Sequence, residues 1–123
     1  KHRRDFTYID DIIECLIRVL DNPPKTNLKS NKLNLDSATT SVPWRIFNVG
    51  NNSSIELMDY IQAIEKALGI KAKKEFLPMQ PGDVLETYAN VDELIAEFNY
   101  KPSMKVQHGV ENFVNWYRKY YHL

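Results

Sequence analysis

The sequence predicts an α/β fold of mixed helices and short strands. Two observations predict it: segments with a helical spacing of apolar residues alternate with short extended runs rich in β-branched and aromatic residues, and polar turns separate them. With 43% hydrophobic and 26% charged residues among 123, the composition is that of a globular chain able to bury a core. The length corresponds to one domain or a piece of one.

The first element is a short extended run that passes directly into a helix. Phe6, Tyr8 and Ile9 suit a half-buried strand, and Asp10 or Asp11 is expected to cap the first helical turn. The helix that follows carries apolar residues along one stripe, which predicts burial against a partner surface. The stripe consists of Ile9, Ile12, Ile13, Leu16, Ile17 and Leu20.

The middle of the chain predicts a long loop and a strand followed by a helix. Residues 25–43 follow two prolines and are rich in Asn, Ser, Thr and Lys, which is typical of a loop. A strand is expected over residues 45–50. Ser53 with Glu56 forms a capping-box pattern for the next helix, which is expected to end at Gly69.

The last third predicts two short extended runs and two helices. Residues 71–77 and 84–89 have strand character, with a turn over residues 79–83 between them. Asn90 with Glu93 predicts a second capping box, opening a short helix with Leu94, Ile95 and Phe98 inside.

The final helix is expected to start near Ser103. Its interior Gly109 costs roughly 1 kcal/mol relative to Ala, which indicates a close backbone approach at that point. One face of the helix is apolar: Val106, Val110, Phe113, Val114, Tyr117 and Tyr121.

Composition narrows the possible partners. Sixteen basic residues balance sixteen acidic ones, so no bulk field draws nucleic acid or anionic membrane. No run approaches the roughly 18 apolar residues of a membrane span. Cys15 is the single cysteine, which excludes an internal disulfide and fits a reducing, cytoplasmic location; we expect it to be structural.

The inventory of chemical groups contains neither a phosphate loop nor a metal site. The four glycines do not form a glycine-rich phosphate loop, so we expect this chain alone to bind no NAD. The three histidines are scattered without metal-ligand spacing. The chain lacks an initiator Met, and its basic start directly abuts the first element, so we expect sequence upstream to be missing.

Three blocks occur in order along the chain: residues 4–11, residues 47–51, and residues 78–84 followed by Thr87-Tyr88-Ala89. Together with residues 109–117 they resemble the C-terminal portion of an extended short-chain dehydrogenase/reductase, specifically an NAD-dependent nucleotide-sugar 4-epimerase. The Pro-Gly-Asp loop preceded by Met-Gln is most similar to that of UDP-glucuronate 4-epimerases. The resemblance covers nearly all of residues 1–123, which are then a C-terminal substrate-binding portion without the N-terminal NAD-binding part.

The resemblance implies four substrate-binding residues and no catalytic, cofactor-binding or metal-binding ones. Arg4 matches the arginine that pairs with the UDP diphosphate, and Asp83 matches the aspartate near the ribose hydroxyls. Gln80 stands where many relatives carry a second phosphate-binding arginine. Thr87 occupies the position facing the hexose, where a small residue leaves room for a C5 carboxylate or an N-acetyl group.

Each of these assignments has a structural alternative. Arg4 could form a surface ion pair, Asp83 could stabilise the turn after Gly82, and Thr87 could be a strand residue pointing into the core.

The activity implied is C4 oxidation of a UDP-sugar by NAD, rotation of the keto sugar and re-reduction on the other face, with UDP-glucuronate and UDP-galacturonate favoured. The expected partners are the UDP-sugar, the chain's own N-terminal NAD-binding part, and a second copy in a homodimer or higher assembly. The chain alone is expected to be inactive, because no tyrosine is followed four residues later by the lysine of the family's proton-transfer pair. Two alternatives remain open: a non-catalytic interaction or scaffold domain, and a related 4,6-dehydratase or decarboxylase.

Overall fold

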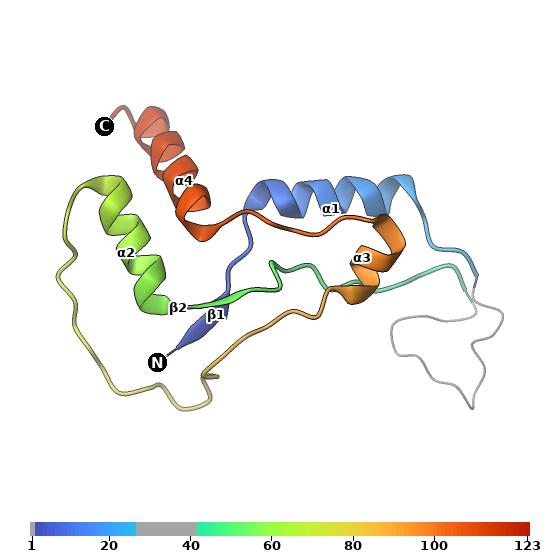
Figure 1. Cartoon of the computed structure of the whole chain (residues 1–123), viewed down its shortest axis with the longest axis horizontal. Helices are drawn as coiled ribbons and strands as arrows, with labels where there is room; N and C mark the ends of the chain where they lie inside the picture. Colours follow the sequence, from blue (N-terminus) through green and yellow to red (C-terminus); the bar gives the residue numbers. More distant parts are fainter. Residues whose placement is uncertain (1, 27–41) are drawn as a thin grey trace.

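The computed structural model describes residues 2–26 and 42–123, and the described residues form two strands and four helices. Figure 1 shows α2 and α4 side by side, with α1 running away from them above α3. This mixture of helices and strands confirms the predicted α/β class. The elements in order are β1 (Arg3–Asp5), α1 (Ile9–Asp21), β2 (Ser54–Glu56), α2 (Leu57–Leu68), α3 (Asp92–Phe98) and α4 (Val106–Tyr121).

The two strands form a short antiparallel ladder in which Arg4 is opposite Ile55. The predicted capping box of Ser53 and Glu56 is therefore wrong, because residues 54–56 pair with β1 instead of opening the helix. Helix α2 starts at Leu57, whose N–H donates to the His2 carbonyl at 2.9 Å, and Glu56 makes no side-chain cap. The helix ends as predicted, in a left-handed conformation at Gly69.

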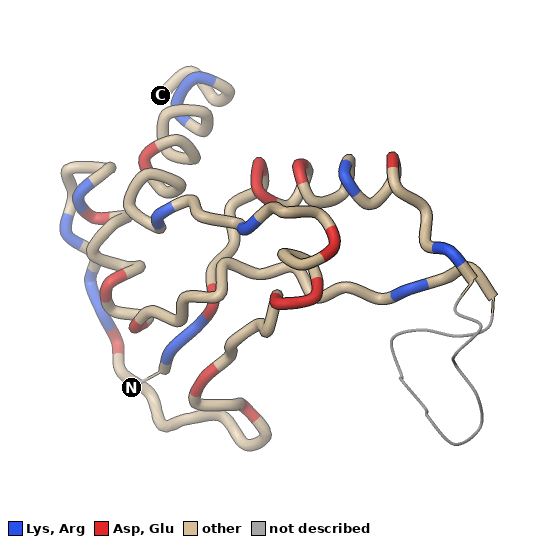
Figure 2. Tube along the Cα trace, turned by 45° about the vertical axis from the view of Figure 1, so that its right-hand side comes forward, with Lys and Arg blue, Asp and Glu red and all other residues tan. Residues whose placement is uncertain are grey.

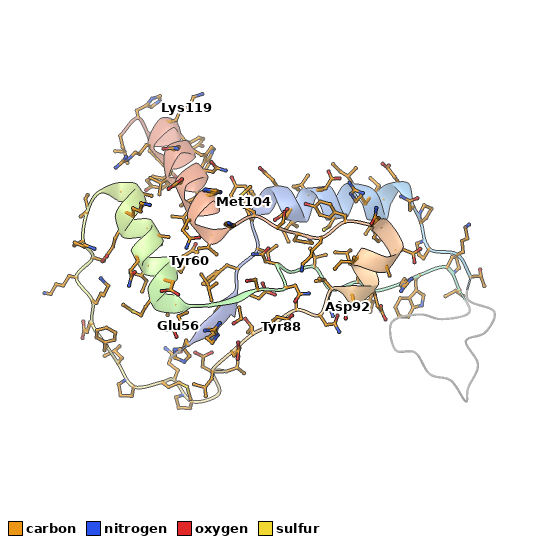
Figure 3. All side chains as sticks on the ribbon, viewed as in Figure 1. Glu56, Tyr60, Tyr88, Asp92, Met104 and Lys119 are labelled. Carbon is orange, nitrogen blue, oxygen red and sulfur yellow. The ribbon has the colours of Figure 1, made fainter. Side chains whose placement is uncertain are left out.

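The start of α1 differs from the prediction in the role of Asp11. Tyr8 occupies the N-cap position, where its side chain makes no capping bond, and Asp10 and Asp11 lie in the first turn. Asp11 is buried and accepts hydrogen bonds from the Tyr100 hydroxyl at 2.6 Å and from the Met104 N–H at 2.9 Å. Its carboxylate therefore joins α1 to the segment before α4, the junction where Figure 3 labels Met104.

The buried side of helix α1 is the one that carries Cys15. Cys15 is 1% exposed and packs on Val91 and Leu94. The structural role predicted for Cys15 is confirmed. The apolar stripe predicted to be buried lies on the outside of the described structure, because α1 packs on α3 through the Cys15 side. Most of the stripe is exposed: Ile9 58%, Ile13 44%, Leu16 59%, Ile17 48% and Leu20 75%.

A second core lies between α2 and α4, where Ala63, Val110 and Val114 are buried. Helix α4 begins three residues later than predicted, since the N–H groups of Ser103 and Met104 donate to Asp11. Its apolar face is buried only in part: Phe113, Tyr117 and Tyr121 are exposed.

The close approach predicted at Gly109 is confirmed. A Cβ built at Gly109 would lie 3.0 Å from the Tyr8 ring, so the glycine lets this aromatic side chain rest against the α4 backbone.

The extended runs predicted over residues 45–50, 71–77 and 84–89 contain none of the described strands. Strand propensity is not enough, because a ladder needs a neighbouring backbone to pair with. The last run makes one parallel bridge, between Arg3 and Glu86. The turn over residues 79–83 is confirmed: Gly82 has a φ of +86°, and the Asp83 N–H donates to the Gln80 carbonyl at 3.2 Å.

The capping box predicted at the start of α3 is wrong, because Val91 occupies the N-cap position and makes no side-chain capping bond. The Asn90 side chain accepts a hydrogen bond from the Asp92 N–H at 2.9 Å, but Glu93 faces Arg45 at 3.5 Å instead of returning to Asn90. Leu94 is buried as predicted, with Ile95 and Phe98 packed against its cluster. The loop predicted over residues 25–43 lies mostly outside the described residues.

Helix α2 anchors the segment that follows it through Glu65, which is 5% exposed. Its carboxylate accepts a hydrogen bond from the Ala72 N–H at 2.9 Å and pairs with Lys71 Nζ at 3.1 Å and with Lys74 Nζ. The bonds from Lys74, Ala72 and Lys71 lower the pKa of Glu65 to about 2. The first residues after α2 are therefore held by an ionised carboxylate.

Candidate functional site

The four residues predicted to bind substrate come from β1 and from residues 80–87. Strand β1 aims the Arg4 guanidinium at the loop before Glu86: Nη2 lies 2.8 Å from Asp83 Oδ1, and Nη1 donates to the Leu85 carbonyl at 3.3 Å. The Arg4 side chain is 26% exposed and that of Asp83 is 40% exposed. The surface ion pair that is the alternative for Arg4 is therefore present.

Asp83 lies at the end of the Pro81-Gly82 turn, where several groups contact it. Its Oδ1 also accepts the Val84 N–H at 2.8 Å, and its Oδ2 lies 3.6 Å from His2 Nε2. The turn brings Gln80 to Asp83 through the backbone. Among the described residues, however, no hydrogen bond joins the Gln80 side chain to Arg4, so the structure does not bring these two side chains together.

Thr87 is exposed, which contradicts its alternative as a core strand residue. Its Oγ1 accepts the Asp5 N–H at 3.2 Å, and its own N–H donates to the Arg3 carbonyl at 3.2 Å. The side chain lines an open hollow of about 330 Å³ together with Thr7, Asn48 and Asn90. Thr87 is therefore attached to the backbone of Arg3 and Asp5, the residues on either side of Arg4, and lies beside a polar cavity.

Asp5 is central to this region and was missed by the sequence analysis. Its carboxylate accepts four backbone hydrogen bonds, from the N–H groups of Asn51 at 3.0 Å, Asn52 at 3.1 Å, Ser53 at 3.4 Å and Ala89 at 3.0 Å. No local pattern could have revealed this role, because the donors lie 46 or more positions away. The only available signal was an acidic residue directly beside the candidate site arginine.

The neighbouring Arg3 contacts β2 and Glu86. It lies 3.1 Å from Glu86 and 3.9 Å from Glu56, and it donates to the Ser54 carbonyl. Figure 2 shows Lys and Arg interspersed with Asp and Glu along the described part of the trace. Arg4 is therefore the arginine that faces the turn over residues 80–83.

The described residues hold no group of three or more side chains that could bind a metal ion. Burial and the hydrogen bond to Asp11 raise the pKa of Tyr100 further above its ordinary range, so this tyrosine stays neutral. No helix in residues 2–26 or 42–123 has both the length and the apolar character to cross a membrane.

Comparison with known proteins shows what the chain is similar to. The chain is 51% identical over 121 residues to an uncharacterized 37.6 kDa protein of Escherichia coli O111:H-, covering 98% of the chain and 36% of that protein. It is 41% identical over 119 residues to a probable UDP-glucuronate 4-epimerase of Rhizobium meliloti (strain 1021), covering 96% of the chain and 35% of the relative. The chain is therefore similar to one part of UDP-glucuronate 4-epimerases. No protein-family model matches it.

A solved structure supports this relationship to the epimerases. The crystal structure of UDP-glucuronic acid 4-epimerase from Bacillus cereus, in complex with UDP-glucuronic acid and NAD, matches with a TM-score of 0.71 and 26% sequence identity. The match covers 98% of this chain and 33% of that one. The resemblance to an extended short-chain dehydrogenase/reductase is confirmed, and the chain spans about a third of the length of the relatives it matches.

Proposed function

We propose that the chain is the C-terminal, substrate-side portion of an NAD-dependent UDP-sugar 4-epimerase and holds the UDP end of its substrate. The observation that carries this proposal is Arg4 facing the loop of Asp83, with Thr87 attached beside it. UDP-glucuronate and UDP-galacturonate are the favoured substrate pair, because the relatives include UDP-glucuronate 4-epimerases.

Arg4 has the donors that a diphosphate requires. A guanidinium offers five N–H donors, and the Arg4 fork makes three hydrogen bonds here, to Asp83 and to the carbonyls of Arg3 and Leu85. Bidentate binding of a phosphate needs a pair of parallel donors, and in this proposal the diphosphate takes the Nη2 donor that bonds Asp83. Displacement by the diphosphate would then free the Asp83 carboxylate to accept hydrogen bonds from the vicinal ribose hydroxyls.

Gln80 and Thr87 complete the proposed contacts. Gln80 is exposed on the turn and donates a hydrogen bond without charge, so Arg4 carries more of the diphosphate than where a second arginine is present. Thr87 offers a hydroxyl at the edge of its hollow to a sugar substituent.

When bound to the complete enzyme, NAD supplies the hydride chemistry; the residues of this chain bind and orient the substrate. The NAD-binding part and the proton-transfer pair are proposed to come from the remainder of a protein as long as the relatives. The contribution of residues 2–26 and 42–123 is therefore to affinity and orientation at the nucleotide end.

The test uses the complete protein and UDP, with affinity measured by calorimetry. Arg4→Ala removes a charge-assisted contact of about 1.5–3 kcal/mol, so we expect affinity to fall at least several-fold. Arg45→Ala is the matched control, because Arg45 pairs with Glu97 at 2.8 Å on α3, away from the site. Unaltered UDP affinity in Arg4→Ala would contradict the diphosphate role.

Product analysis tests the activity. UDP-glucuronate incubated with the complete protein is expected to yield UDP-galacturonate. A decarboxylated product would instead assign a decarboxylase, and a 4-keto-6-deoxy sugar formed from UDP-glucose, whose C6 hydroxyl can leave as water, would assign a 4,6-dehydratase. Absence of both turnover and UDP binding would favour the scaffold alternative.

A further inference from the structure

Asp5 connects the three segments that surround the candidate site. Its carboxylate holds the turn of residues 51–53 and the Ala89 N–H, while its own N–H donates to Thr87 Oγ1. Bonds to an ionised carboxylate are stronger than bonds between neutral groups. Residues 87–89 are therefore attached to one residue of β1 through both its backbone and its side chain.

Strand geometry separates this function from that of Arg4. Successive side chains of a strand point to opposite faces, so neighbours in β1 contact different segments. Arg4 reaches Asp83 and Leu85, whereas Asp5 reaches residues 51–53 and Ala89. Asp5 can consequently set where residues 87–89 lie relative to Arg4 without taking a donor from the guanidinium.

Gly50, Ala89 and the Asp5 carboxylate are closely packed against one another. A Cβ built at Gly50 would lie 2.3 Å from the Ala89 Cβ and 3.0 Å from Asp5 Oδ2, so only glycine fits between them. Interiors packed this closely transmit a displacement to their neighbours. A change at Asp5 or Gly50 is therefore expected to move residues 87–89.

We propose that Asp5 is a positioning residue that fixes Thr87 relative to Arg4, and with it the hexose relative to the diphosphate. This inference rests on the function proposed above. Arg4 stays on β1 with its own partner, Asp83, when the Asp5 carboxylate is lost. The sugar end of the substrate then loses its alignment while the UDP end keeps its contacts.

The test compares two constants of the complete protein in Asp5→Asn: KM for UDP-glucuronate, and the Kd for UDP by calorimetry. We expect KM to rise on the order of tenfold, while the Kd for UDP changes by less than about twofold because UDP has no hexose. The ratio of the two constants is the readout, since a loss of folded protein alone leaves it unchanged.

Asp11→Asn is the matched control. Asp11 is also a carboxylate that joins segments, accepting the Tyr100 hydroxyl and two backbone N–H groups, but its donors lie at residues 100–104. Both variants are expected to lower Tm, and only Asp5→Asn is expected to change the ratio. The same ratio in the two variants overturns the proposal.

Two further measurements keep the proposal testable. The first replaces Asp5→Asn if that variant fails to fold, and the second applies if UDP binding is absent. The double variant G50A/A89G moves the methyl group across the junction, and the proposal expects the same change in the ratio; an unchanged ratio overturns it. Hydrogen exchange at the Ala89 N–H requires no substrate. Protection should fall at least several-fold in Asp5→Asn, and unchanged protection contradicts the positioning role even where Arg4→Ala behaves as proposed.

Discussion

Thr87 shows how one side chain combines two functions. Its Oγ1 accepts the Asp5 N–H at 3.2 Å, so the hydroxyl is fixed to β1 while the residue itself stays exposed beside the polar hollow. A threonine leaves space where a tyrosine would fill it. The size of this side chain is therefore expected to decide which hexose substituents fit.

Thr87→Tyr in the complete protein is expected to lower turnover of UDP-glucuronate and UDP-N-acetylhexosamine far more than that of UDP-glucose. The physical reason is steric, since only the larger substituents collide with the added ring. Thr87→Val separates size from hydrogen bonding, because it keeps the shape and removes the acceptor. Equal losses on all three sugars in Thr87→Tyr would point to a folding defect and end the pocket hypothesis.

At the scale of the elements, α2 and the segment after it are coupled by Glu65. Its folded pKa of about 2 lies below the ordinary value of 4.5, so ionisation of Glu65 stabilises the fold above about pH 4.5. This stabilisation is lost as the pH falls towards 2. The window follows from the sign of the shift, since a depressed pKa means that the unfolded chain binds the proton first.

Urea unfolding between pH 6 and 2 measures this contribution. Glu65→Gln is expected to flatten the decline in stability that the unsubstituted protein shows below about pH 4.5. Glu111→Gln is the control, because Glu111 is an exposed carboxylate of α4. Parallel pH profiles for Glu65→Gln and the unsubstituted protein would refute the assigned role.

Helices were predictable from the sequence because their signal is local. The periodicity of α2 and the glycine at its end are written within one segment, as is the turn at Gly82. The strands were not, since β2 forms where β1 supplies a partner some fifty residues away, and that partner replaced the predicted capping box. A ladder depends on which segment arrives beside it.

The residues of the candidate site also differ in whether the sequence could predict them. Arg4, Asp83 and Thr87 were predicted through a resemblance that preserves their order, and the structure brings Asp83 and Thr87 beside β1. Asp5 and Asp11 were misjudged or missed because their donors are backbone N–H groups, which carry no residue identity. A carboxylate that binds backbone leaves no mark on the sequence of its partners.

At the scale of the whole molecule, the described structure exposes the apolar stripe of α1. Leu16 is 59% exposed and Leu20 is 75% exposed, although their spacing is that of a buried face. Large exposed apolar patches favour association. The chain of residues 1–123 expressed alone is therefore expected to self-associate. It is also expected to turn over no UDP-sugar, because it contains neither a glycine-rich phosphate loop nor the proton-transfer pair.

Light scattering over a range of concentrations checks this expectation. Leu16→Lys with Leu20→Lys should shift the molecular mass towards the monomer, because the charges interrupt the stripe. Phe76→Lys with Leu77→Lys is the matched control, since these residues are 79% and 75% exposed on the loop after α2. A monomer at high concentration without any substitution would count against the expectation.

Ion pairs contact the segment between α2 and Glu86 at two places that differ in exposure. At one end the anion is Glu65, whose side chain is 4% exposed; at the other end the anion is Asp83, whose side chain is 40% exposed. Dissolved salt weakens exposed ion pairs much more than buried ones. Rising ionic strength should therefore weaken the pair of Arg4 and Asp83 before it weakens the bonds of Glu65. The guanidinium then becomes more accessible, while the backbone hydrogen bonds of Leu85 and Thr87 to Arg3 keep the segment beside β1.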